Sequence, residues 1–244
     1  MTQTLRGKTA VVTGVSSGIG RATATLLVAA GVRVIGIARR SEKFTSLEQE
    51  FGSAFVPLVA DLALPAERSR LVEEIARCAS GVDIFVSNAA ECVYESALDL
   101  PAAQLERLFQ VNVLAGVELC AAIVPLMRGG GHVVQLSSVV ADFMPNARFG
   151  PYAASKAAIE QFVLALRLEL QPKGVRVSLV RPGLVDTPIY EKVPGFDATR
   201  EKLNRQVTHW LEPRDVAEAI VWLLERPAHV TVSELDLLPT EQTR

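Results

Sequence analysis

A glycine-rich turn reads Thr13-Gly14-Val15-Ser16-Ser17-Gly18-Ile19-Gly20 and directly follows the apolar run Thr9–Thr13. Glycines permit a tight turn between a strand and a helix, and they let backbone N–H groups approach a ligand closely. The N-terminus of the helix that follows adds a partial positive charge. The turn therefore predicts a cradle for a pyrophosphate, and the alternative is a tight turn that holds no ligand.

On both sides of this turn, short apolar runs alternate with longer helical patterns. Continuous Val, Ile and Leu runs are typical of strands that are covered on both faces. We predict strands at Thr9–Thr13, Arg33–Ala38, Phe55–Ala60, Val82–Ser87, His132–Leu136, Arg176–Val180 and Val230–Leu235. We predict helices at Gly18–Ala30, Glu42–Phe51, Glu67–Ala79, Ala102–Met127, Pro151–Leu170 and Pro213–Leu224. Such alternation favours an α/β fold with a parallel sheet.

One segment breaks the alternation. Residues 187–211 are polar, carry scattered aromatic side chains and show no strand pattern. A connection of this length is typical of a lid or substrate loop. Because no Gly-, Ser- or Pro-rich linker divides the chain, we expect residues 1–244 to form a single domain, with 187–211 as a mobile substrate-loop insertion within it.

Bulk composition limits the classes of function. The 244 residues carry 25 Lys and Arg against 27 Asp and Glu, so there is no basic stripe for nucleic acid. Cys78, Cys92 and Cys120 lack the spacing of a disulfide frame or a zinc site, so we expect reduced thiols, no metal and a cytoplasmic protein. The polar start predicts no signal peptide, and the apolar helix near Val111 to Met127 contains polar residues, so we expect no membrane span.

Polar motifs follow five of the predicted strands. Besides the glycine-rich turn, they read Asp61-Leu62, Asn88-Ala89-Ala90, Ser137-Ser138 and Pro182-Gly183-Leu184-Val185-Asp186-Thr187. The carboxyl ends of parallel strands lie along one edge of a sheet, which is where open α/β sheets bind their ligands. We therefore expect these motifs to line one cleft.

Tyr152 and Lys156 lie four residues apart in a predicted helix that begins at Pro151, so they share one face. A free tyrosine loses its proton near pH ~10, and an ammonium group one turn away favours the phenolate and lowers its pKa. A hydroxyl from a neighbouring strand end, at Ser138 or at Ser137, would hold a substrate oxygen beside the phenol. The pattern is typical of a general acid/base site for an alcohol or carbonyl. An exposed helix pair without a catalytic role is the alternative.

Taken together, these motifs resemble the short-chain dehydrogenase/reductase family over essentially the whole chain. The resemblance implies a doubly wound Rossmann fold, with a seven-stranded parallel sheet flanked by helices on both faces. It also implies an oxidoreductase that transfers a hydride between a nicotinamide coenzyme and a carbonyl or secondary alcohol of a small molecule. One departure from the family pattern is Ala90, which replaces the glycine of the Asn-Ala-Gly motif.

The family's site residues map onto this chain through the same motifs. The implied catalytic residues are Asn112, Ser138, Tyr152 and Lys156. The implied coenzyme-binding residues are Gly14, Ser16, Ser17, Gly18, Ile19, Gly20, Arg39, Asp61, Leu62, Asn88, Ala89, Tyr152, Lys156, Pro182, Gly183, Val185 and Thr187. By resemblance, Lys156 also holds the nicotinamide ribose, and Asn112 sits in a kinked helix whose carbonyl binds a water linked to that lysine. A buried asparagine satisfied by its neighbours is the alternative for Asn112.

The type of nicotinamide coenzyme depends on the residues after the second predicted strand. An acidic side chain there would accept hydrogen bonds from the ribose 2′-hydroxyl of NAD, but this chain has Ala38-Arg39-Arg40. Arginine pairs with phosphate in a forked, charge-assisted geometry. We therefore predict NADP(H), with two solvated arginines as the alternative.

The sequence gives fewer constraints on the substrate. Aromatic and apolar side chains predict a pocket with apolar walls, and they are Phe143, Met144, Phe149, Tyr190, Phe196 and Trp210. Arg148 or Arg205 would bind a carboxylate, although a solvated surface arginine is the alternative for each. The C-terminal tail Val230–Thr240 lacks the Gly-Gly motif of many family members and resembles a subgroup that acts on small hydroxy acids, amino alcohols and other carbonyl substrates.

Assembly and two rival functions complete the expectations. The resemblance implies a homodimer or homotetramer built on the helices at Ala102–Met127 and Pro151–Leu170. A regulator that binds the coenzyme without catalysis is one rival, but such proteins usually lose the tyrosine or the lysine. An epimerase or dehydratase of nucleotide sugars is the other, and those enzymes usually have a larger substrate domain.

Overall fold

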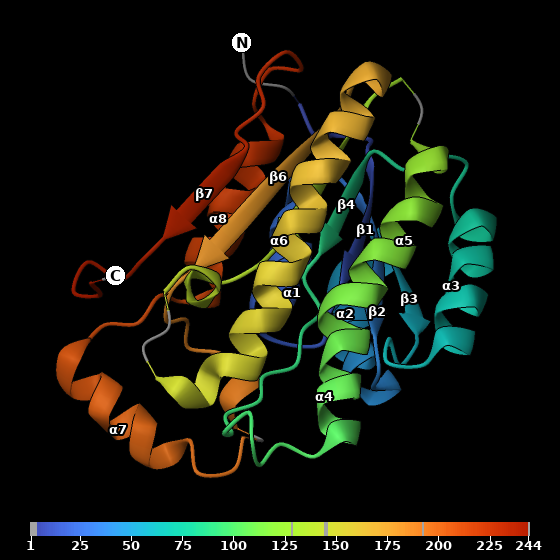
Figure 1. Ribbon diagram of the computed structural model, residues 1–244. Helices are drawn as coiled ribbons and strands as arrows, with labels where there is room; N and C mark the ends of the chain where they lie inside the picture. Colours follow the sequence, from blue (N-terminus) through green and yellow to red (C-terminus); the bar gives the residue numbers. More distant parts are fainter. Residues whose placement is uncertain (1–3, 128, 144–145, 192, 244) are drawn as a thin grey trace.

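The computed structural model describes residues 4–127, 129–143, 146–191 and 193–243. Its centre is a seven-stranded sheet in the order β3-β2-β1-β4-β5-β6-β7, in which each neighbouring pair is parallel (Figure 1). The strands are β1 Thr9–Thr13, β2 Arg33–Ala38, β3 Phe55–Val59, β4 Ile84–Ser87, β5 Gly131–Leu136, β6 Val175–Pro182 and β7 Glu234–Leu237. The predicted Rossmann fold is confirmed, and the strand order reverses beside β1, where such sheets bind ligands.

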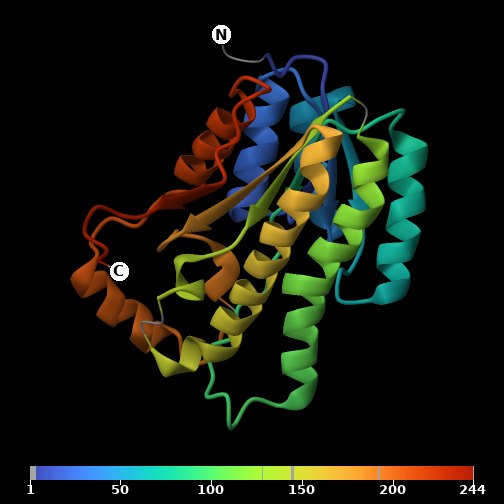
Figure 2. The same cartoon turned by 45° about the horizontal axis from the view of Figure 1, so that its top comes forward.

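Helices cover both faces of the sheet (Figures 1 and 2). On one face lie α1 Gly18–Ala29, α2 Phe44–Phe51 and α8 Pro213–Leu224, and on the other lie α3 Pro65–Cys78, α5 Ala115–Ile123 and α6 Gly150–Leu170. The helix α4 Ala102–Phe109 continues the direction of α5 past the carboxyl ends of the strands, and α7 Asp197–Gln206 lies beyond that same edge.

Two apolar cores form because successive strand residues point to opposite faces. On β1, Val11 packs into the core under α3, α5 and α6, whereas Ala10 and Val12 pack into the core under α1, α2 and α8. All three side chains are fully buried. This two-sided burial explains why the strands are continuous apolar runs, and it makes the sheet a rigid platform for the loops at its edge.

The last strand begins later than its sequence indicates. The run from Val230 predicts a strand over Val230–Leu235, but β7 spans Glu234–Leu237. Side chains of β6 take the carbonyl groups upstream of it, since Arg176 donates to the Val230 oxygen at 3.1 Å and Ser178 donates to the Val232 oxygen at 2.6 Å. With those acceptors occupied, strand pairing starts only at Glu234.

The single helix predicted over Ala102–Met127 is also interrupted. A π-helical segment, Gln110–Leu114, separates α4 from α5, and a 3₁₀ turn at Val124–Leu126 contains Pro125. By length and composition the run Ala102–Leu126 could cross a membrane, but α5 contributes Leu119, Cys120 and Ile123 to the core. This is the pattern of a core helix, as the sequence predicts.

Residues 187–211 contain the helix α7, which the sequence pattern did not predict. None of the side chains of α7 is fully buried, so the segment has no apolar stripe to reveal a helix. Two contacts outside α7 attach the segment to the rest of the fold. Phe196, just before the helix, is 1% exposed, and Leu211, at the end of the segment, forms an isolated parallel bridge with Val185.

His132 is a buried titratable group outside the cleft. Its side chain is 2% exposed on β5, and Nε2 lies 2.8 Å from Ser178 Oγ. Since that hydroxyl donates to Val232, it accepts from Nε2–H. Among the described residues Nδ1 has no partner. Burial, with the nearby cations Arg176 and Lys8, lowers the pKa of His132 to about 3.

We expect this histidine to make the fold sensitive to acid. Between pH ~6.5 and pH 3 the unfolded chain binds a proton that the folded chain excludes, so stability falls as pH falls, by at most ~1.4 kcal/mol per pH unit. The free energy of unfolding, measured with urea at several pH values, should depend less on pH for His132→Asn than for the wild type. Substitution of the exposed His229 is the control. An equal pH dependence of the unfolding free energy for wild type and His132→Asn would contradict the assignment.

Candidate active site

The glycine-rich turn closes against the loop that follows β4. Gly14 has φ +77°, and a Cβ there would lie 2.6 Å from Asn88 Nδ2. A Cβ on Gly20 would lie 2.4 Å from the Gly14 carbonyl oxygen. Side chains at either position would clash with backbone or with Asn88, so the chain can only make this turn with glycine. The turn leaves its backbone open to a ligand, which fits the predicted pyrophosphate cradle.

Thr13 connects the glycine-rich turn to the loop after β4 through hydrogen bonds. Its hydroxyl accepts hydrogen bonds from the N–H groups of Asn88 and Ala89, both at 2.9 Å, and its carbonyl accepts from Asn88 Nδ2 at 2.8 Å. Thr13 is 2% exposed, so these bonds are protected from water. The methyl group of Ala90, in place of the glycine of the family motif, lines the cleft without disturbing this contact.

A cavity of about 480 Å³ runs along the carboxyl edge of the sheet. Most of the predicted coenzyme residues line it, namely Gly14, Ser16, Ser17, Gly18, Ile19, Arg39, Asp61, Leu62, Asn88, Ala89, Tyr152, Lys156, Pro182 and Thr187. Its size is typical of a small-molecule site. The five strand-end motifs therefore meet in one cleft, as their positions predict.

Other predicted residues lie behind the lining. Gly20 makes room for the turn, and Val185 is buried in the core under α8. Gly183 approaches the C-terminal tail, where its N–H donates to Leu237 and a Cβ would lie 2.4 Å from Gln242 Oε1. Asn112 and Ser138 also lie outside the lining, and each contacts a residue of it, Asn112 at the Glu91 carbonyl and Ser138 at the Pro182 carbonyl.

Asn112 lies in the π-helical segment and is 3% exposed. Its amide nitrogen donates to the Glu91 carbonyl at 2.9 Å and to Ser155 Oγ at 3.0 Å, and its Oδ1 accepts from Glu91 N at 2.8 Å. π-Helical turns often occur at functional sites. Here the side chain connects the loop after β4 to α6, so these contacts of Asn112 are structural.

The hydroxyl of Ser138 lies near that of Tyr152 and lowers the pKa of the phenol, while its Oγ lies 3.5 Å from the Pro182 carbonyl oxygen. Ser138 Oγ also accepts weakly from Val140 N at 3.4 Å. Ser137 lines the cleft, but its hydroxyl lies beside the Glu160 carboxylate. Of the two serines left open by the sequence, Ser138 is therefore the one that lies near the tyrosine hydroxyl.

Burial governs the charges of Tyr152 and Lys156. It raises the pKa of Tyr152 well above the ordinary value, and the neighbouring Ser138 hydroxyl offsets this only in part. Burial also lowers the pKa of Lys156 to about 8. The lysine ammonium donates to the Leu136 carbonyl at 3.2 Å and lies 5.7 Å from the centre of the tyrosine ring. The expectation that Lys156 by itself lowers the pKa of the tyrosine is wrong for the protein alone, because desolvation outweighs the more distant charge.

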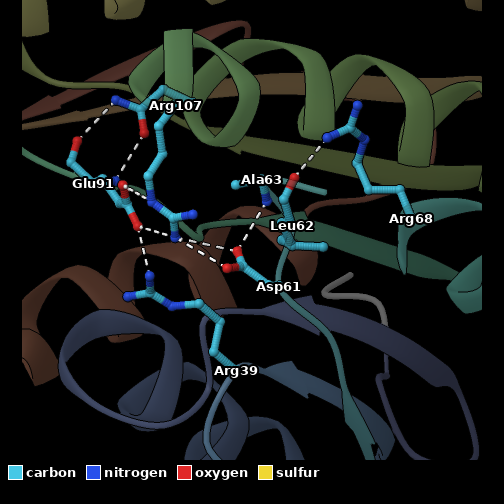
Figure 3. A network of polar contacts seen from close by, with 8 residues as sticks. Arg39, Asp61, Leu62, Ala63, Arg68, Glu91 and Arg107 are labelled. Atoms are coloured by element: carbon cyan, nitrogen blue, oxygen red, sulfur yellow. Dashed lines mark hydrogen bonds and ion pairs between the residues drawn. The ribbon is translucent and has the colours of Figure 1, made fainter. Parts of the chain in front are cut away.

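Arg39 has a partner that the sequence did not indicate. Its Nη1 donates to Glu91 Oε1 at 2.6 Å. Arg107, from α4, binds the same carboxylate through Nε and Nη2 at 3.1 and 2.9 Å, and also reaches Asp61 at 3.2 Å (Figure 3). Neither Glu91 nor Arg107 belongs to a recognisable motif. Glu91 directly follows Asn88-Ala89-Ala90, and that position was the only signal for it.

Aromatic side chains form an apolar cluster that includes Tyr152. Tyr94, Phe149 and Phe196 pack edge to face, and Tyr190 stacks on Phe196 at 4.3 Å. Arg148 lies 4.5 Å over the Tyr94 ring and pairs with Glu95, so its charge is already partnered. Arg205 is exposed, and Met144 lies outside the described residues. Burial raises the pKa of Cys92 to about 12, which keeps this thiol protonated in the wall.

Comparison with known proteins agrees with this geometry. The family model described as short chain dehydrogenase matches residues 8–196. An uncharacterised oxidoreductase of Staphylococcus epidermidis is 30% identical over 96% of this chain and 98% of its own length. A probable NADP-dependent dehydrogenase of Haemophilus influenzae is 29% identical over 98% of this chain and 96% of its own length.

Two solved structures are similar over nearly the whole fold. Serine dehydrogenase in complex with NADP⁺ has a TM-score of 0.89 and 29% identity, and the match covers 97% of this chain and 96% of that one. L-Sorbose reductase from Gluconobacter frateurii, in complex with NADPH and L-sorbose, has a TM-score of 0.86 and 27% identity, with 98% of each chain covered.

The buried ammonium of Lys156 predicts a measurable effect on stability. Because its pKa is about 8 in the folded chain and 10.5 ordinarily, the unfolded chain holds more protons between these values, and wild-type stability rises with pH there. Lys156→Met removes the burial penalty, so we expect it to be more stable than wild type at pH 7 by about 1–2 kcal/mol. Denaturant unfolding should show this difference shrinking from pH 8 to pH 10, and a constant difference would refute the assignment.

Proposed function

Because this chain belongs to the short-chain dehydrogenase family, we propose that it is an NADP(H)-dependent oxidoreductase acting on a carbonyl or secondary alcohol of a small molecule. The observation that carries the proposal is the Ser138–Tyr152–Lys156 cluster, whose Tyr152 and Lys156 line the same cleft as the glycine-rich turn. A regulator that only binds a nucleotide has no need for a buried tyrosine hydroxyl next to a serine and an ammonium.

The residues of the cleft fit a dinucleotide. The backbone at Gly14 to Gly18 would hold the pyrophosphate, Asp61 and Leu62 the adenine, and Arg39 the ribose 2′-phosphate. Tyr152, Lys156, Pro182 and Thr187 would surround the nicotinamide half. When bound, the nicotinamide supplies or accepts the hydride equivalent. Both complexes described above hold the phosphorylated coenzyme, which supports NADP(H) here.

Proton transfer is assigned to Tyr152. Since burial keeps its phenol protonated, Tyr152 is ready to donate a proton to a carbonyl oxygen, and Ser138 is close enough to donate a hydrogen bond to the same oxygen. The Lys156 ammonium stabilises the phenolate that remains after donation. For the oxidation of an alcohol the same groups act in reverse, and the positive charge of an oxidised nicotinamide further favours the phenolate.

The substrate proposed is a small carbonyl compound with one apolar side. Tyr94, Phe149, Tyr190 and Phe196 form one apolar cluster with Tyr152, which supports apolar surroundings for the reacting group. The segment 187–211 supplies part of this cluster, and we propose that it moves to admit the substrate. Serine and L-sorbose, named with the two similar structures, are small molecules that carry hydroxyl or carbonyl groups, which supports a small substrate with such a group.

We also propose that the enzyme is a homodimer or homotetramer in the cytoplasm. Leu114, Leu164 and Leu168 are 40%, 39% and 73% exposed, and they lie on the helices on which the family resemblance places an interface. A second copy packed on this face would remove those side chains from water.

Replacing Tyr152 tests the acid/base assignment. Tyr152→Phe removes only the hydroxyl, so we expect NADPH binding to stay within about twofold and turnover of a reducible ketone to fall by about 10²-fold or more. NADPH fluorescence gives binding, and NADPH consumption with a panel of small ketones and ketoses gives turnover. Tyr94→Phe is the matched control and should keep turnover within about tenfold. A Tyr152→Phe variant that turns over like wild type would overturn the assignment.

Reversing the charge of Arg39 tests the choice of coenzyme. An arginine–phosphate pair contributes about 1.5–3 kcal/mol, so Arg39→Asp should weaken NADPH relative to NADH by about tenfold or more. Titrations of both coenzymes give this ratio. Arg40→Asp makes the same charge change one residue further along the chain, and a larger effect at Arg40 would transfer the role to that residue.

A further inference from the structure

The ion pair between Arg39 and Glu91 crosses the coenzyme cleft. Arg39 follows β2, Glu91 follows β4, and β1 with its glycine-rich turn lies between those strands. All three elements line the same cavity. The contact at 2.6 Å therefore spans the end of β1, over the region that the adenosine half of a dinucleotide must enter. It occupies the guanidinium that the sequence assigns to phosphate.

The carboxylate of Glu91 is held unequally by its two arginines. Arg107 binds both of its oxygens, with Nε on Oε2 at 3.1 Å and Nη2 on Oε1 at 2.9 Å, whereas Arg39 binds only Oε1 (Figure 3). The side chain of Arg39 is 50% exposed and that of Glu91 is 22% exposed. If the contact with Arg39 is broken, Glu91 keeps both hydrogen bonds to Arg107, so its charge remains paired. Arg39 is therefore the exchangeable partner.

From this asymmetry we propose that Glu91 competes with the ribose 2′-phosphate for Arg39 and so limits the preference of the enzyme for NADP(H) over NAD(H). The inference rests on the coenzyme assigned above. A phosphate monoester carries more charge than a carboxylate and offers three acceptor oxygens, so it displaces Glu91 when it binds. An adenosine without the 2′-phosphate leaves the Arg39–Glu91 pair in place.

Arg107 is the positioning residue of this device. Besides holding Glu91, its Nη2 reaches both oxygens of Asp61 at 3.3 and 3.2 Å, and Asp61 Oδ1 accepts from Ala63 N at 3.0 Å. These contacts fix Glu91 relative to the loop after β3, on the adenine side of the cleft. The carboxylate is thereby kept within reach of Arg39 in the free enzyme and after exchange.

The test compares two ligands that differ only in the 2′-phosphate. Calorimetry measures the affinity of wild type and Glu91→Gln for adenosine 2′,5′-bisphosphate and for adenosine 5′-phosphate. Because a half-exposed ion pair contributes little, we expect the variant to bind the bisphosphate about two- to fivefold more tightly and the monophosphate equally well. Glu91→Ala should change the affinities in the same direction, and thermal unfolding shows that each variant is folded.

Two controls separate competition from a general loss of negative charge. Glu42→Gln removes an exposed carboxylate that is three residues from Arg39 in the sequence and forms no ion pair within the described residues, and it should change neither affinity. In an Arg39→Gln background, Glu91→Gln should have no effect on the bisphosphate, whereas simple repulsion between Glu91 and the phosphate would persist. The single variant Glu91→Gln keeps Arg39. If it binds the bisphosphate with the same affinity as wild type, or more weakly, the proposal is overturned.

The same measurements distinguish a failure of the Glu91 proposal from a failure of the coenzyme assignment. If wild type binds neither the bisphosphate nor NADPH, the coenzyme assignment is wrong. If wild type binds both but Glu91→Gln behaves like wild type, only the competition by Glu91 is lost.

Discussion

The contact between Thr13 and the loop after β4 is the constraint on which the site depends. One buried hydroxyl accepts two backbone N–H groups, and one carbonyl accepts the Asn88 amide. With these bonds made, the turn at Gly14 lies so close to Asn88 that no side chain fits at Gly14. The loop that follows then carries Glu91 to Asn112, and through Ser155 to α6, where Tyr152 and Lys156 lie. The close approach of Thr13 to the loop after β4 thus fixes the position of the phosphate cradle relative to the proton-transfer cluster.

Burial has opposite effects on the two titratable groups of that cluster. It disfavours the charged form of each, raising the pKa of Tyr152 and lowering that of Lys156 to about 8, so at neutral pH the tyrosine is a phenol while most of the lysine is still an ammonium. A neutral phenol is the form that donates a proton to a carbonyl oxygen. The dry end of the cleft therefore prepares the tyrosine for reduction, and the reverse reaction needs additional positive charge near the ring.

Much of this arrangement could be predicted from the sequence because it depends on local patterns. The fully apolar strands, the strand-end motifs and the Tyr152–Lys156 spacing each carry their own signal, and the parallel topology brings them to one edge. α7 and the start of β7 could not be predicted in this way. α7 has no apolar stripe, and β7 starts late because Arg176 and Ser178, distant in sequence, take carbonyl groups that a strand would use.

Arg39 illustrates the same limit within the site. Its position after β2 identifies it as a phosphate-binding residue, but no local pattern shows what neutralises its charge before a phosphate arrives. A guanidinium beside a cleft attracts any carboxylate within reach, and Glu91, from a loop about fifty residues away, is fixed there by Arg107. The affinity for a phosphorylated coenzyme is therefore a difference between two ion pairs, and a motif describes only one of them.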